Sequence, residues 1–138
     1  MHVLTLLIAT LVATVPPGAP PKPATPSGPP PAWVESGTRS TWLAYSGYCW
    51  RTTCADYLPP ASRPDLPALV ATRGTRVAIH LAFRPSSASV TVLGARPLTT
   101  KLAVDRVLTW RPTRGGVFTV NLKTAAGSAS YAGRLRLR

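Results

Sequence analysis

Apolar and polar residues alternate with a period of two through most of the chain after residue 67. Between residues 75 and 83, the apolar side chains at 77, 79, 81 and 83 fall on one face, and His80 falls on the other. Such alternation predicts a strand that is buried on one side only. Similar runs predict strands at 68–72, 89–93, 101–104, 106–110, 117–123 and 128–137.

These runs are separated by short segments rich in Pro, Gly and Ser, and no stretch shows a helical period. About seven short strands in roughly 100 residues indicate an all-β domain. We expect an antiparallel β-sandwich with an immunoglobulin-like arrangement. A small closed β-barrel is the alternative, because alternation alone does not separate the two.

The N-terminal part has a different composition. Residues 1–15 form an apolar segment whose uncharged core, residues 3–15, would span only about 20 Å as a helix. That length predicts a signal-peptide-like segment and no stable membrane span; whether it is cleaved or acts as an anchor stays open. Residues 16–32 contain nine prolines and predict an extended spacer. The folded domain is then expected at residues 33–138.

The formal net charge of +12 is placed unevenly. Residues 33–68 are neutral, with three arginines and three acids, whereas residues 69–138 carry twelve basic residues and one acid. A basic surface attracts anionic partners such as nucleic acid, acidic lipid or anionic wall polymers. If Leu135 and Leu137 point inward, one sheet face carries the polyanion-binding candidates Arg134, Arg136, Arg138 and Lys123. The same charges also serve to prevent edge-to-edge aggregation.

Cys49 and Cys54 are the only cysteines of the chain. In an exported protein such a pair predicts a disulfide, here across a hairpin that turns at Arg51 and Thr52. The alternative is a redox or metal-handling site that uses Cys49, Cys54 and His80. The spacing is longer than that of a redox Cys-x-x-Cys pair, and further metal ligands are few, so the structural disulfide is favoured.

Five of the ten aromatic residues lie between Trp42 and Tyr57, around the cysteine pair. Such side chains offer flat contact area on which a sugar ring, a peptide or a base stacks. We take Trp42, Tyr48, Trp50 and Arg51 as ligand-contact candidates. The other interpretation is that some of these rings fill the sandwich core, and alternation places Tyr48 and Trp50 on the face opposite Cys49.

No catalytic constellation is visible in the sequence. The four acids, Glu35, Asp56, Asp65 and Asp105, show no spacing for paired-carboxylate catalysis. His80 has no nucleophile motif to serve, and on an outward strand position we expect it to be solvated. We therefore predict neither enzyme activity nor a cofactor or metal site.

The string Gly47-Tyr48-Cys49-Trp50, with Cys54-Ala55-Asp56 and later Pro59-Pro60 and Phe83-Arg84-Pro85, carries a family resemblance. It is similar to small secreted proteins and lipoproteins of Gram-positive bacteria with a Gly-x-Tyr-Cys-Trp…Cys-x-Asp signature and no established activity. The resemblance implies an extracytoplasmic location, secreted or in the bacterial cell envelope, and no catalytic residue. This chain lacks the lipobox cysteine of the lipoprotein members.

Together these features predict an exported binding or structural module. Its expected partner is an envelope component, namely an anionic polymer, a glycan or a protein, and nucleic acid is the least favoured. The oligomeric state stays open.

Overall fold

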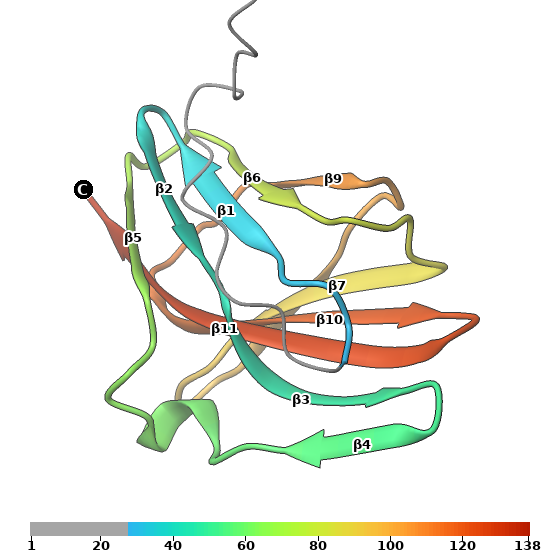
Figure 1. The fold of residues 1–138 in the computed structure, drawn as a ribbon. Coiled ribbons are helices and arrows are strands. Elements are labelled where there is room, and N and C mark those ends of the chain that lie inside the picture. Colours follow the sequence, from blue (N-terminus) through green and yellow to red (C-terminus); the bar gives the residue numbers. More distant parts are fainter. Residues whose placement is uncertain (1–27) are drawn as a thin grey trace, which may run out of the picture.

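The computed structural model describes residues 28–138, which form two β-sheets packed face to face (Figure 1). The smaller sheet has the order β2 (Arg39–Trp42), β1 (Trp33–Ser36), β6 (Val77–His80) and β9 (Val107–Trp110). The larger sheet has the order β4 (Thr53–Asp56), β3 (Ala44–Trp50), β11 (Gly127–Leu137), β10 (Gly116–Thr124), β7 (Ser87–Val92) and β8 (Leu98–Lys101). A single 3₁₀ turn, Pro60–Ser62, lies between β4 and β5 (Ala68–Ala71).

The long strand β11 organises the larger sheet. Along one edge it pairs with β10 from Gly127 to Leu135. Its other edge is divided between two strands, because β3 pairs antiparallel with the first half and β5 pairs parallel with the last four residues. Strand β5 therefore continues the sheet where β3 leaves off, and it contacts β1 and β2 of the smaller sheet.

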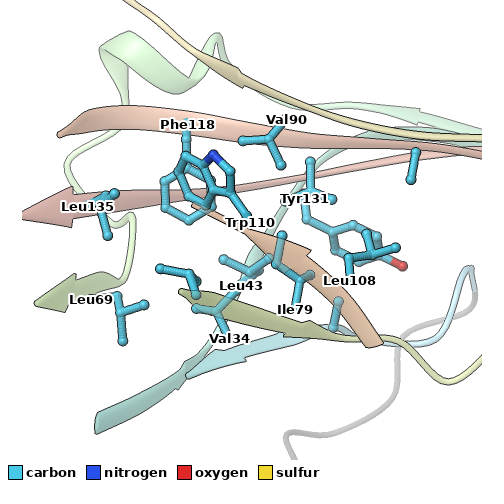
Figure 2. Close-up of a cluster of buried hydrophobic side chains, with 14 of the residues drawn as sticks. Val34, Leu43, Leu69, Ile79, Val90, Leu108, Trp110, Phe118, Tyr131 and Leu135 are labelled. Carbon is cyan, nitrogen blue, oxygen red and sulfur yellow. The ribbon is translucent and has the colours of Figure 1, made fainter. Parts of the chain in front are cut away.

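The core lies between the two sheets and is built from the residues that alternate inward (Figure 2). Val34 and Ile79 of the smaller sheet and Phe118 and Tyr131 of the larger one are fully buried. Branched and aromatic side chains on facing strands fill a sandwich interior, and their burial is the main stabilising contribution to such a fold.

The residues just before β1 belong to the folded domain. Pro29 and Ala32 are buried, and the Leu43 amide donates to the Ala32 carbonyl. The hydroxyls of Tyr45 and Tyr131 donate 2.6 Å hydrogen bonds to the carbonyls of Pro29 and Pro30. The domain thus begins by Gly28, five residues ahead of the predicted boundary at residue 33.

The rest of the predicted spacer and the apolar segment at residues 1–15 lie outside the described residues. From Gly28 onward, no helix is long and apolar enough to cross a membrane.

The predicted all-β sandwich is confirmed, and neither sheet closes into a barrel within residues 28–138. The predicted strand number of about seven was too low, because this region contains eleven strands. The strand predicted at 101–104 was wrong: β8 covers Leu98–Lys101 instead. All four residues of the edge strand β8 are exposed, so its sequence shows no apolar alternation. Leu102 and Val104, which follow β8, are half-buried, and their period-two spacing led to the wrong prediction.

Candidate functional site

The cysteine hairpin forms as predicted. Strands β3 and β4 pair with Cys49 opposite Cys54, and the two residues form a disulfide. Both cysteines are exposed on the outer face of the larger sheet, because Cys49 lies opposite Ser128 of β11. The neighbouring Tyr48 and Trp50 take the other face and pack against the core, as alternation predicted.

A second group of aromatic side chains lies on the outer face of the smaller sheet. Trp33 of β1 is the cross-strand neighbour of Trp42 on β2 and of His80 on β6. Directly opposite residues in antiparallel strands project to the same side of a sheet. Since Val34 and Ile79, the next pair along, are fully buried, the row of Trp42, Trp33 and His80 points away from the core.

His80 holds the Trp33 ring in place. Their ring centroids lie 3.7 Å apart with planes only 3° from parallel, so the imidazole covers one face of the indole. His80 Nε2 donates a 2.7 Å hydrogen bond to Oε1 of Glu35, two residues along β1 from Trp33. Stacking and this hydrogen bond together fix the orientation of both rings and place a carboxylate beside them.

The turn between β3 and β4 carries the cationic residue Arg51, which lines a pocket together with Gly28 and Pro30. Arg51 sits in this turn with a φ of 55°, and its amide donates to the Ala126 carbonyl in the neighbouring β10–β11 turn. The adjacent Trp50 ring packs on Phe83 at a centroid distance of 5.2 Å. The hairpin end is therefore attached both to the larger sheet and to the segment that follows β6.

Two pockets meet at Pro30, which lines both. One has a volume of about 440 Å³ and is lined by Gly28, Pro30, Trp50, Arg51, Thr52 and Thr53. The other has a volume of about 240 Å³ and is lined by Pro30, Pro31, Trp33, Trp42, His80, Leu81 and Ala82. We call the two pockets together the aromatic cleft.

The aromatic cleft combines apolar rings with free polar groups. Three of the four tryptophans of the chain line it. The Arg51 guanidinium and the hydroxyls of Thr52 and Thr53 make no hydrogen bond to any described residue. Flat rings flanked by a few unpaired donors and acceptors are the usual composition of a small-molecule or sugar site.

The half-buried Tyr45 and the buried Tyr131 hold Pro29 and Pro30, and Pro30 is the residue shared by the two pockets of the cleft. Burial, with smaller contributions from the nearby hydroxyls of Tyr57 and Tyr48, raises the pKa of Tyr45 to about 12. Burial also raises the pKa of Tyr131 above its ordinary value. Both side chains therefore keep their protons, which they donate to the Pro29 and Pro30 carbonyls.

The structure brings three of the four predicted ligand-contact residues to the cleft. Trp42 lines one pocket, and Trp50 and Arg51 line the other, whereas Tyr48 lines neither and packs against the core. Sequence reasoning missed Trp33 as a site residue and took His80 to be solvated. Only the pairing register of β1 and β6 reveals their contact, and no local pattern encodes that register.

The predicted basic stripe is broken up in the structure. Arg136 is exposed, but Arg134 donates from its guanidinium to the Arg63 carbonyl at 2.9 Å. Lys123 pairs with Ser128, whereas Arg134 pairs with Val117 at the opposite end of the β10–β11 ladder. Six residues of strand separate the two positions, which is about 20 Å. Lys123 therefore does not join the three arginines.

The residues of the alternative redox or metal site are also kept apart. The disulfide lies on the outer face of the larger sheet, and His80 lies on the outer face of the smaller one. No group of three or more His, Cys, Asp or Glu residues that would hold a metal occurs between residues 28 and 138.

Comparisons of this chain with protein-family models, curated proteins and solved structures found no match in any of the three. Residue roles at the aromatic cleft therefore rest on its geometry.

Proposed function

We propose that this protein is an exported, non-catalytic module that binds a glycan of the bacterial cell envelope in the aromatic cleft. The observation that carries the proposal is the convergence of Trp33, Trp42 and Trp50 from two sheets on adjoining pockets. A pyranose ring has an apolar C–H face that packs on indole, and its hydroxyls need hydrogen-bond partners at the rim.

The rim of the cleft supplies those partners. Arg51, Thr52 and Thr53 lie at one end, and His80, which stacks on the Trp33 ring, lies at the other. Sugar sites need donors and acceptors at fixed positions, because each hydroxyl that is buried without a partner costs free energy.

The positions of the acidic side chains favour binding without catalysis. No acidic side chain of residues 28–138 lines the aromatic cleft, and Glu35, two residues along β1 from Trp33, is already engaged by His80. Glycoside hydrolysis ordinarily uses a pair of carboxyl groups on either side of the bond. The exposed disulfide supports an extracytoplasmic location, because such bonds persist in oxidising compartments.

Isothermal titration calorimetry of the full chain with chito-oligosaccharides and cello-oligosaccharides tests the proposal. We expect binding that weakens about tenfold in Trp42→Ala, because a stacking surface is lost. Arg51→Ala should weaken it by a similar factor, because a hydrogen bond from a charged donor contributes about 1.5–3 kcal/mol. Leu98→Ala is the control, because Leu98 is an exposed apolar residue on β8, outside the cleft. The proposed function would be contradicted if neither sugar series binds, or if Leu98→Ala loses as much affinity as the two cleft variants.

A further inference from the structure

A separate pocket opens where the smaller sheet meets β5. It has a volume of about 270 Å³ and is lined by Ser36, Gly37, Thr38, Arg39, Val70, Ala71, Thr72, Thr75 and Arg138. None of these residues lines the aromatic cleft. We call this second site the arginine pocket.

The two arginines reach the arginine pocket from different sheets. Arg39 of β2 lies directly opposite Ser36 of β1, whose side chain is buried, so Arg39 projects to the same inner side at the edge of the smaller sheet. Arg138 follows β11, and its backbone is held on both sides: its amide donates to Ala71 at 2.9 Å, and its carbonyl accepts from Arg73 at 3.0 Å.

Neither guanidinium has an acidic partner in the described residues. Glu35 is hydrogen-bonded to His80, and Asp65 forms an ion pair with Arg63 at 2.9 Å. Asp105 accepts from the amide of Arg106, and Asp56 lies on β4 of the larger sheet. None of the four acidic side chains lines the arginine pocket, so no side-chain carboxylate of the described residues pairs with its two guanidinium groups.

Hydroxyl groups complete the lining. The Thr75 hydroxyl donates to the Thr72 carbonyl at 2.6 Å, and the Ser36 hydroxyl donates to the Arg76 carbonyl at 3.4 Å. The hydroxyls of Thr38 and Thr72 make no hydrogen bond to any described residue. Two free hydroxyl donors therefore lie beside the two unpaired guanidinium groups.

We propose that the arginine pocket is an anion site that binds a phosphate group. A guanidinium donates two parallel hydrogen bonds to a pair of oxygens, and a phosphate has enough oxygens to satisfy two such forks and the Thr38 and Thr72 hydroxyls together. A carboxylate has only two oxygens. The site differs from the basic stripe predicted from the sequence, because Arg138 alone is common to both.

The first experiment titrates the ¹⁵N-labelled full chain with inorganic phosphate and follows amide chemical shifts. We expect the largest changes at Gly37, Thr38 and Thr75, with binding weakened at least tenfold in the double variant Arg39→Ala/Arg138→Ala. The charge-matched control is Arg84→Ala/Arg111→Ala, which removes two exposed arginines that do not line the pocket. Its affinity should remain within about twofold of the wild type.

The result that overturns the proposal is either an absence of shifts at these three amides or an equal loss in the two double variants. The second outcome would mean that phosphate binding responds only to the overall charge of the protein.

A second titration, with linear polyphosphate, distinguishes a free phosphate from a phosphate group within a polymer. Tighter binding than inorganic phosphate, lost in Arg39→Ala/Arg138→Ala, identifies a phosphate within a polymer, and equal or weaker binding identifies a free phosphate.

Discussion

The hydroxyl of Tyr131 donates a hydrogen bond to the carbonyl of Pro30 at 2.6 Å, across 101 residues of sequence. Tyr131 is fully buried in the last strand, and Pro30 precedes the first. Pro30 lines both pockets of the aromatic cleft, so this hydrogen bond connects the cleft to the centre of the core. The position of the cleft is therefore coupled to the stability of the domain.

Tyr131→Phe should lower the free energy of unfolding by about 1–2 kcal/mol, because it leaves the Pro30 carbonyl without its donor. Urea denaturation measures this change. Thr109→Val is the control, because it removes an exposed hydroxyl that makes no hydrogen bond to the described residues and should change stability by less than about 0.5 kcal/mol. An unchanged stability in Tyr131→Phe would mean that Pro30 is not held by this bond.

The raised pKa values of Tyr45 and Tyr131 predict a loss of stability in alkali. A group with a raised folded-state pKa stabilises the fold fully below its unfolded pKa, here near 10. That contribution is lost as the pH rises through the folded pKa, which is about 12 for Tyr45. Thermal unfolding between pH 9 and 12 should show a decline that is shallower in Tyr45→Phe/Tyr131→Phe. An equally steep decline in that variant would exclude these two tyrosines as its cause.

Gly127 should tolerate no side chain. It begins β11 with a φ of 137°, and a Cβ atom there would collide with the backbone carbonyl oxygen of Cys49. Gly127→Ala should cost about 3 kcal/mol or more, since both backbone strain and the collision contribute.

Gly74→Ala is the matched control for that variant. Gly74 also has a positive φ, 81°, but a Cβ there would meet nothing within 4 Å. We expect it to cost only about 1 kcal/mol, from the left-handed backbone conformation alone. Equal losses in the two variants would show that the approach of Gly127 to Cys49 does not matter.

Reduction of the disulfide should be a local event. Closing a loop with a sequence separation of five contributes only about 2 kcal/mol in the chain-entropy model. Cys49→Ala/Cys54→Ala should therefore remain folded, with faster amide exchange confined to β3, β4 and their turn. Hydrogen exchange measured by mass spectrometry checks this, and loss of protection in β6 and β9 would contradict it.

Local patterns predicted much of the fold. The cysteine hairpin needs only a spacing of four residues between Cys49 and Cys54. Strand β11 was predicted within one residue because apolar and polar positions alternate on both sides of Ala132 and Gly133. The strands at 33–42 were not placed individually, because each covers only four residues and so short a run shows too little of the period-two alternation.

The candidate site was predicted only in part. Trp42, Trp50 and Arg51 were found because they cluster around the cysteines, yet they reach the cleft from two different sheets. The stacking of Trp33 on His80 depends on the pairing of β1 with β6, 47 residues apart, and register over that distance is set by the whole core. The same reason explains why no local pattern indicated that Arg39 and Arg138 line one pocket.

The most direct test of glycan binding in the aromatic cleft follows the four indole N–H signals of the ¹⁵N-labelled full chain during titration with a chito-oligosaccharide. Trp33, Trp42 and Trp50 line the cleft, whereas Trp110 is buried in the core with 3 % of its surface exposed and acts as an internal control. We predict saturable shifts of the first three signals and none of the fourth. Four unchanged signals, or equal shifts of all four, would contradict the proposed function.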